Sequence, residues 1–488
     1  MEERYFSRVS LNLKNPKTIL KSVSLTIAAA KSKRHCDTRN MQIRVCDAIC
    51  GSGKTLASID MISNNPDKRY IIITPYLREV ARVKACCSQQ GFVSPEYRYT
   101  TGFSKLQDIN SLLKSGENIV STHSLFTSYT QETKDLIQKQ NYTLILDEVI
   151  DLFQTVKLHN GDIEMLLRNK VAEKKGDEVV WADNEYKGIV FDEIMHMSQS
   201  KNLIDFDGVI FFWSVPQDVF LCFSEVYILT YLFEYQMLKY FFEARNLEYE
   251  LIGVRKEKDA YRFCPMNEMN RALDLRKKIH ILKSDKKNYI GTDDFSLSAA
   301  WFERNLKQPG QAGLTVLKNH LYNIFRHEFV CKNNEKMWTT LDRYKKHLKG
   351  KGYSKSFSAF NLRATNELAD KKYLAFCLNV FMHPWMRNYL LKLGAREVNQ
   401  DMYALSVLVQ WIFRSAIRND EEVWIYLPSK RMRFLLERWL ANLAAGSDLL
   451  PIQFETQKKK KELQPREIIR RVAQAIREKK ITKGGQGR

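Results

Sequence analysis

The chain has 488 residues, of which 44% are hydrophobic and 27% are charged, and these proportions exclude a disordered chain and leave room for two or three folded domains. The formal net charge of +21 favours a polyanionic partner, most often nucleic acid and less often an acidic membrane surface, although a basic surface can also serve solubility alone. Nine cysteines without a repeated spacing favour reduced thiols. Residues Met1 to Tyr5 lack the basic start and apolar core of a secretory signal, and the apolar stretches are too short for a membrane span. We therefore expect a protein of the bacterial or host cytoplasm that is not secreted and has no membrane partner.

The first half of the chain alternates between apolar strand-like runs and amphipathic helices. Residues 1–40 form a basic N-terminal extension, and the alternation begins after them. Strands are expected at 41–46, 69–74, 117–122, 142–146 and 226–230, with a helix at 77–89. Continuous apolar strands separated by helices indicate a parallel sheet covered on both faces. We predict a first α/β domain over 41–255, interrupted by a charge-rich insertion at about 155–206.

A linker is expected at 256–275, and the alternation then resumes in a second α/β domain over 276–445. Its predicted elements are helices at 313–327, 342–348 and 402–418 and strands at 337–341, 356–361 and 422–427. The remaining segment, 446–488, is a basic tail, with a net charge of +8 from residue 451 onward. This tail either contacts a phosphate backbone or keeps the chain soluble.

A phosphate-binding loop is predicted between the first strand and the helix that follows it. Its residues are Ala48, Ile49, Cys50, Gly51, Ser52, Gly53, Lys54 and Thr55. The small residues let the backbone curl so that its N–H groups point at phosphate oxygens. Lys54 would place a positive charge between the β- and γ-phosphates, and Thr55 would offer a hydroxyl to Mg²⁺. Bound phosphates would then lie at a helix N-terminus.

Two acidic residues, Asp147 and Glu148, follow the apolar strand predicted at 142–146. Ligands bind at the carboxyl ends of strands in open parallel sheets, so this pair is expected beside the phosphate loop. Asp147 would hold Mg²⁺ through water, and Glu148 would act as the general base for the attacking water. The alternative is an acidic surface turn after a core strand.

Further short motifs follow these two elements in a fixed order along the chain. They are Thr74-Pro75 and Thr122-His123 at strand ends, Thr230 at the end of another strand, Arg363-Ala-Thr365-Asn366, and Gln410-Trp-Ile-Phe-Arg414-Ser-Ala-Ile-Arg418. Together with the phosphate loop and the acidic pair, this ordered set resembles the superfamily two (DEAD/DEAH-like) helicases and translocases. The likeness is closest to the divergent helicase-like proteins of phages, plasmids and other mobile elements.

The resemblance implies an α/β fold class with two tandem RecA-like P-loop NTPase domains, each built on a parallel sheet, that hold ATP and Mg²⁺ between them. The implied catalytic residues are Lys54, Asp147, Glu148, Gln410, Arg414 and Arg418. Either Arg414 or Arg418 would be the arginine finger that stabilises charge on the transferred phosphoryl group. The implied nucleic-acid contacts are Thr74, Pro75, Thr122, His123, Arg363, Thr365 and Asn366, and Thr230 would couple the two activities.

The leading functional hypothesis is therefore an ATP-dependent helicase or translocase that moves on or unwinds nucleic acid, with DNA favoured over RNA. One alternative is a viral genome-packaging ATPase of the terminase type, which would add a metal-dependent nuclease. Another is a nucleic-acid-binding protein with a degenerate helicase fold that acts without ATP. Protein partners and the polarity of movement stay open.

Overall fold

The computed structural model describes residues 42–97, 104–156, 160–183, 185–186, 191–199, 203–206, 210–216, 218–258, 260–269, 275–361 and 367–444. The predicted basic extension at 1–40 and basic tail at 446–488 lie outside these described residues, and so do Arg363, Thr365 and Asn366. All the described residues belong to one structural unit, which ends at Gly446.

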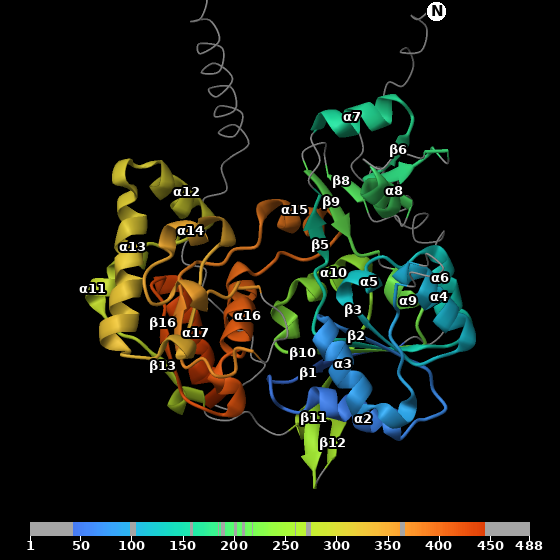
Figure 1. The fold of residues 1–488 in the computed structure, drawn as a ribbon, viewed down its shortest axis with the longest axis horizontal. Helices are drawn as coiled ribbons and strands as arrows, with labels where there is room; N and C mark the ends of the chain where they lie inside the picture. The colour runs from blue at the N-terminus through green and yellow to red at the C-terminus, as the bar shows by residue number, and fades with distance from the viewer. Residues whose placement is uncertain are drawn as a thin grey trace, which may run out of the picture. The chain divides into compact units, whose positions relative to one another are not determined.

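The first α/β domain is built on a seven-stranded sheet with the order β12-β11-β1-β10-β4-β2-β3 (Figure 1). Its strands are β1 (Gln42–Asp47), β2 (Tyr70–Thr74), β3 (Ile119–Thr122), β4 (Thr143–Asp147), β10 (Glu225–Thr230), β11 (Glu250–Glu257) and β12 (Ala260–Pro265). All neighbouring strands are parallel except β11 and β12. β10 lies between β1 and β4, and the three strands are parallel. The loop after β1 and the acidic end of β4 therefore lie at the same edge of the sheet, the one formed by the carboxyl ends of the strands.

Helices cover both faces of this sheet because its strands are apolar on both sides. In β2, Ile71 and Ile73 belong to one hydrophobic cluster, whereas Tyr70 and Ile72 belong to another on the opposite face. The covering helices are α2 (Lys54–Ser63), α3 (Leu77–Cys86), α4 (Lys105–Ser115), α5 (His123–Phe126), α6 (Gln131–Lys139), α9 (Asp218–Leu221) and α10 (Met237–Arg245).

The charge-rich insertion is a folded antiparallel sheet, with the order β5-β9-β8-β7-β6. Its elements are β5 (Phe153–Thr155), α7 (Asn160–Arg168), β6 (Ala172–Lys175), β7 (Glu178–Trp181), α8 (Asp192–Gln199), β8 (Leu203–Phe206) and β9 (Ile210–Ser214). It continues past the predicted end at 206 because β9 supplies the strand that pairs with both β5 and β8. We call this unit the middle domain.

The second α/β domain has a four-stranded parallel sheet with the order β13-β16-β15-β14. Its strands are β13 (Ile279–Ile281), β14 (Lys336–Thr339), β15 (Tyr373–Phe376) and β16 (Val423–Tyr426). Its helices are α11 (Asp285–Asn288), α12 (Ala299–Lys307), α13 (Ala312–Asn323), α14 (Lys345–Leu348), α15 (Pro384–Lys392), α16 (Gln400–Ile412) and α17 (Lys430–Ala444). The predicted α/β class, with two tandem domains that each contain a parallel sheet, is confirmed.

Several predicted boundaries differ from the structure. β12 lies inside the predicted linker at 256–275, because it pairs antiparallel with β11 and closes the edge of the first sheet. The strand expected at 356–361 is absent: Ser354–Ser356 is a 3₁₀ turn, and Phe357 makes a single bridge to Trp338. The helix expected at 402–418 ends at Ile412, and a 3₁₀ turn follows at Ala416–Asn419.

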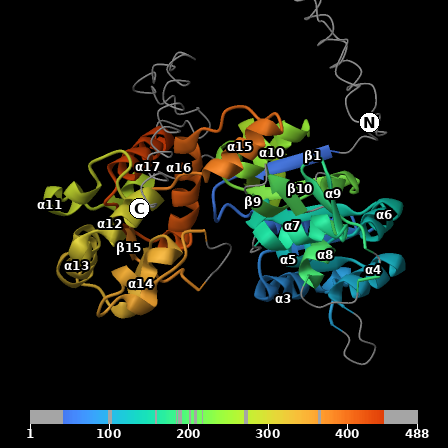
Figure 2. The same ribbon diagram turned by 90° about the horizontal axis from the view of Figure 1, so that it is seen from above.

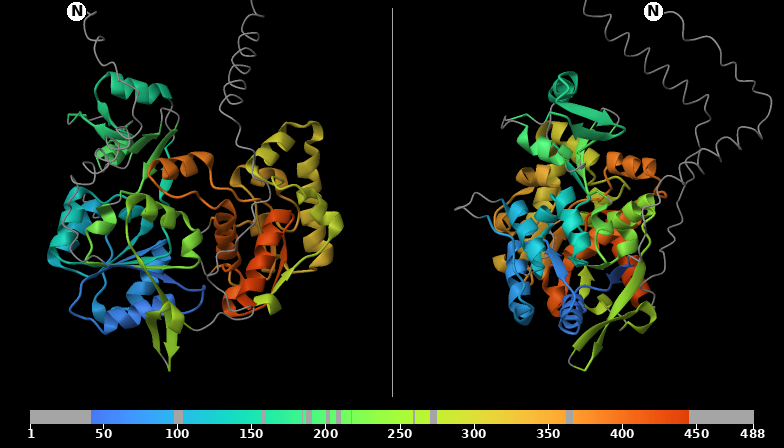
Figure 3. Two further views of the ribbon diagram at one scale, coloured as in Figure 1. Left: turned by 180° about the vertical axis from the view of Figure 1, so that it is seen from behind. Right: turned by 90° about the vertical axis from the view of Figure 1, so that its right-hand side faces the viewer.

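One segment of the second α/β domain is buried in the core of the first. Met382, Trp385, Tyr389, Leu390, Ala395 and Val398 all belong to the hydrophobic cluster of the first domain. Trp385 and Tyr389 of α15 contact Phe153 and Phe212 of the middle domain, with ring centroids 4.6 to 6.1 Å apart. Helix α15 also lies beside α10 of the first domain (Figures 2 and 3). We call residues 382–398 the anchor segment.

Candidate active site

The loop after β1, which is predicted to bind phosphate, has a curled backbone. Gly51 and Gly53 have φ angles of +85° and +93°, in the left-handed region that glycine tolerates. A Cβ on Gly53 would also lie 2.1 Å from the Tyr261 ring of β12, so only glycine fits there. Helix α2 begins directly after this loop, at Lys54. The loop is therefore held in its curled shape by its own glycines and by the neighbouring strand.

The loop residues fit a phosphate group. The Ser52 hydroxyl is buried and has no hydrogen-bond partner in the described part of the protein, so it is free to donate to a ligand. Lys54 Nζ donates to the carbonyl oxygens of Ala48 and Ile49, at 2.6 and 3.0 Å, and thus folds back over the loop. A phosphate would replace these carbonyls as a partner of higher charge.

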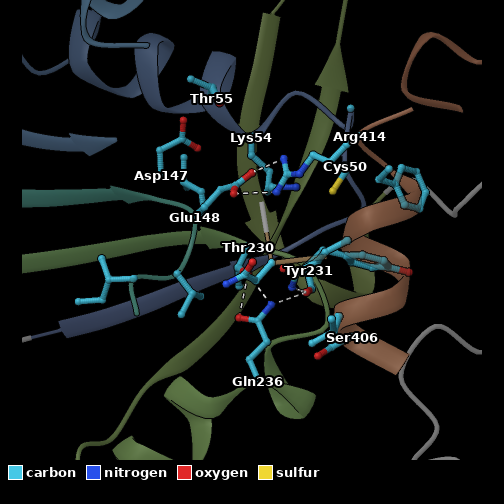
Figure 4. A pocket seen from close by; sticks show the side chains of 18 of the residues that line it. Cys50, Lys54, Thr55, Asp147, Glu148, Thr230, Tyr231, Gln236, Ser406 and Arg414 are labelled. Carbon is cyan, nitrogen blue, oxygen red and sulfur yellow. Dashed lines mark hydrogen bonds and ion pairs between the residues drawn. The ribbon is translucent and has the colours of Figure 1, made fainter. Parts of the chain in front are cut away.

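A cavity of about 340 Å³ opens from this loop between the two α/β domains. It brings together residues that are far apart in the sequence, and Figure 4 shows several of them facing one another. Ten of the predicted site residues line it: Gly51, Gly53, Lys54, Thr55, Asp147, Glu148, Thr230, Gln410, Arg414 and Arg418. Thr55 and Asp147, the predicted Mg²⁺-binding residues, both line this cavity and carry oxygen donors that suit this ion.

Arg414 and Glu148 form a bidentate ion pair across the cavity (Figure 4). The two guanidinium nitrogens donate to the two carboxylate oxygens at 2.7 and 2.8 Å. Arg414 is 4% exposed, and Glu148 has a left-handed backbone with φ of +67°. The predicted base and one predicted arginine finger are therefore bound to each other, although 266 residues separate them in the chain.

The electrostatics of Asp147 are set by its burial. Desolvation, and after it the neighbouring charge of Glu148, raise the pKa of its carboxyl to about 6, whereas Arg82 and Lys54 act to lower it. Asp147 is thus charged at neutral pH, but in surroundings that favour its neutral form. The positive charges of Arg82 and Lys54 therefore favour the ionised carboxylate.

Two cavity residues on α3, Glu79 and Arg82, were not predicted from the sequence. Arg82 Nε donates to Glu79 at 2.7 Å, and both side chains line the same cavity as Asp147. Their spacing of three residues places them on one face of the helix that follows Thr74-Pro75. That spacing was visible in the sequence, but only the fold shows which face of α3 meets the cavity.

The segment at the end of β10, where Thr230 lies, contacts the second α/β domain. The Thr230 hydroxyl and the Gln236 amide are hydrogen-bonded, and Gln236 also donates to the carbonyl of Tyr231 at 2.7 Å. Gln410 of α16 donates to that same carbonyl at 3.4 Å. The predicted residue Gln410 thus contacts the segment that follows Thr230.

Asp47 ties the same segment to the phosphate loop. Its carboxylate accepts the backbone N–H groups of Leu232 and Phe233, at 2.7 and 3.0 Å. Burial raises its pKa to about 6, and those two N–H groups act in the opposite direction. Sequence reasoning missed Asp47, whose position directly before the loop was the available signal.

The predicted nucleic-acid contacts have mixed outcomes. Thr74 is completely buried, and its hydroxyl faces the carbonyls of Tyr76 and Ser121, so the prediction that it touches a phosphate is wrong for this structure. Pro75, Thr122 and His123 are partly exposed. The His123 ring nitrogen Nε2 lies 3.2 Å from the carbonyl oxygen of Asp147, next to the acidic pair.

Two family models match the chain: the YonV C-terminal Rossmann-like domain over residues 273–440 and the YonV middle domain over residues 153–213. The chain is 38% identical over 417 residues to the SPbeta prophage-derived uncharacterized protein YonV of Bacillus subtilis (strain 168), a match that covers 82% of this chain and 99% of that protein. The middle-domain match coincides with the antiparallel sheet of β5 to β9.

Among solved structures, the chain is similar to S. tokodaii Xpd4, with a TM-score of 0.43 and 12% identity over 88% of this chain and 98% of the other. It is also similar to the DUF1998 helicase MrfA, with a TM-score of 0.29 and 11% identity over 91% of this chain and 60% of the other. Within the described residues, no helix has the length and apolarity needed to cross a membrane.

Proposed function

The chain belongs to the YonV family, and we propose that it is a nucleic-acid-dependent ATPase that works as a helicase or translocase of the superfamily two type. One observation carries this proposal: a single cavity joins the phosphate loop and acidic pair of the first domain to Gln410, Arg414 and Arg418 of the second. That arrangement suits a hydrolase whose nucleotide is held by both domains. The prophage origin of its relative supports a site of action in the bacterial cytoplasm.

In this proposal the basic residues hold the phosphates, and the acidic residues hold Mg²⁺ and activate water. Lys54 and the loop N–H groups would hold the phosphates, and Thr55 with Asp147 would hold Mg²⁺, which when bound neutralises charge on the phosphate oxygens. Glu148 would take the proton from the water that attacks the γ-phosphorus. Arg414 and Arg418 would stabilise the charge that develops on the phosphoryl oxygens.

The Arg414–Glu148 pair bears directly on this chemistry. A carboxylate that accepts two hydrogen bonds from a guanidinium is a weak base, and an arginine bound to a carboxylate is a weak phosphate ligand. Hydrolysis therefore requires this pair to separate. We propose that the γ-phosphate competes with Glu148 for Arg414, so that nucleotide binding frees the base and positions the arginine together.

Steady-state ATP hydrolysis tests the proposal, measured alone and with single- and double-stranded DNA and RNA. We expect one polymer, DNA ahead of RNA, to stimulate hydrolysis, and we expect Lys54→Ala to abolish it. Lys105→Ala is the matched control, because Lys105 is likewise the first residue of a helix but is exposed and away from the cavity. The control should hydrolyse ATP at the wild-type rate.

Other outcomes would favour the alternatives. Hydrolysis that no polymer stimulates, together with Mn²⁺-dependent cleavage of DNA, would move the assignment to a packaging ATPase. Nucleic-acid binding that is indifferent both to ATP and to Lys54→Ala would leave a binding protein with a degenerate helicase fold.

A further inference from the structure

A basic surface lies on α14 and the loop that follows it, in the second α/β domain. Residues 343–355, which we call the basic loop, contain six lysines and arginines, and no acidic residue occurs from 343 to 361. Four of these side chains are exposed and form no ion pair with a carboxylate in the described part of the chain. They are Lys346, Lys349, Lys351 and Lys355.

The basic loop is held rigid from beneath. The buried Lys336 donates to the carbonyl of Gly352 at 3.0 Å, and the buried indole of Trp338 donates to the carbonyl of Tyr353 at 2.9 Å. The buried Tyr353 hydroxyl in turn donates to the carbonyl of Leu348 at 2.7 Å. A loop that only kept the protein soluble would need none of these contacts. A charged surface that is already ordered loses little conformational entropy when it binds a partner.

The basic loop also leads directly to the nucleotide cavity. Lys345 Nζ lies 3.9 Å from the ring centroid of Phe357, and that ring packs on Trp338 with centroids 5.0 Å apart. Phe360 and Asn361, three and four residues further along the chain, line the cavity. Only a few residues therefore separate Lys355 from the cavity, and Phe357 in the middle of this segment packs on Trp338.

We propose that the basic loop binds the phosphate backbone of nucleic acid and forms a sequence-independent contact beside the nucleotide cavity. Lysine ammonium groups attract phosphates as point charges, whereas sequence is read through base edges and aromatic stacking. The tyrosines within this loop are Tyr344 and Tyr353, and both are buried, so neither is available to stack on a base. This inference rests on the proposed function, because it names a surface that would hold the nucleic-acid track.

The test is the salt dependence of binding to fluorescent single-stranded and duplex DNA and RNA. Each phosphate contact contributes about 0.7 to 0.9 to the slope of log K against log salt, so four lost contacts should reduce that slope by about 3. We expect this reduction for the quadruple variant Lys346→Ala, Lys349→Ala, Lys351→Ala and Lys355→Ala. Circular dichroism and thermal melting would check that the variant is folded.

A second quadruple variant controls for the loss of net charge. It carries Lys139→Ala, Lys283→Ala, Lys286→Ala and Lys430→Ala, four exposed lysines that likewise form no ion pair among the described residues. It should bind with nearly the wild-type slope. If both quadruple variants lost the same amount of slope, general charge would explain the binding and the proposal for this loop would fail.

The same binding measurements separate the role of the basic loop from the proposed function of the whole protein. If the wild-type chain bound no nucleic acid, the proposed function itself would fail. If the wild type bound and the basic-loop variant kept its full slope, only this inference would be overturned. Binding of phosphatidylserine vesicles that the loop variant loses, with nucleic-acid binding unchanged, would overturn it as well and assign the loop to a membrane surface.

Discussion

Asp147 is charged at neutral pH in surroundings that favour its protonated form. Because burial raises its pKa from 3.8 to about 6, the folded protein binds a proton more tightly than the unfolded chain between these values. The contribution of this group to stability therefore decreases as pH rises from about 4 to about 6. We expect Asp147→Asn to raise the free energy of unfolding by about 2 kcal/mol at pH 7, without nucleotide or Mg²⁺, while ATP hydrolysis is lost.

Urea unfolding at several pH values measures this effect. The gain from Asp147→Asn should disappear near pH 4, where the native carboxyl is protonated, and the exposed control Asp67→Asn should change stability by less than about 0.5 kcal/mol at any pH. An Asn variant that was no more stable than the wild type at pH 7 would contradict the electrostatic account of this site.

At the scale of secondary structure, β12 supports the phosphate loop through the ring of Tyr261. This ring lies where a Cβ on Gly53 would be, and β12 packs along α2. We expect Tyr261→Ala to leave a cavity under the loop and to weaken binding of a fluorescent ATP analogue by about tenfold, about 1.4 kcal/mol. Tyr261→Phe keeps the ring and should bind like the wild type, so equal losses in both variants would argue against packing as the cause.

The short strands show why part of the fold escaped prediction. β15 is a central strand of the second sheet but has only the four residues Tyr373–Phe376. The apolar run from Tyr373 was a usable signal, yet a strand of this length carries little periodicity. Ser356–Asn361 looked more like a strand but lies at the sheet margin, where only Phe357 makes a bridge. Pairing with neighbours, which is a tertiary property, decided both cases.

The candidate site was predictable to the extent that its motifs are local. The phosphate loop and the acidic pair are each made of consecutive residues. The structure places residues of both motifs in one cavity. Thr74 was misassigned because a strand buried on both faces encloses its last residue as well. Glu79 and Arg82 were missed because only packing shows which side of a helix faces a cavity.

At the scale of the whole molecule, the anchor segment makes the two α/β domains depend on each other. Its residues complete the core of the first domain, and Lys392 pairs with Asp177 of the middle domain at 2.9 Å. We expect Trp385→Ala to cost about 3 to 5 kcal/mol and to split one thermal unfolding transition into two. Differential scanning calorimetry measures this directly.

Phe434→Ala is a suitable control for that experiment, because Phe434 is a large aromatic residue of the same domain that is 49% exposed. It should leave a single transition. Two transitions in the wild type would mean that the domains unfold independently in spite of the anchor segment.

The backbone of Glu148 has a consequence for how this family can change over time. Its φ of +67° is one that glycine and asparagine adopt more readily than glutamate, and the adjacent Asp147 is buried at the expense of stability. Replacing Asp147 would therefore tend to stabilise the chain, whereas replacing Glu148 would relieve its backbone but leave the buried charge of Arg414 without its partner. In a lineage released from selection on this site, drift would therefore replace Asp147 before Glu148.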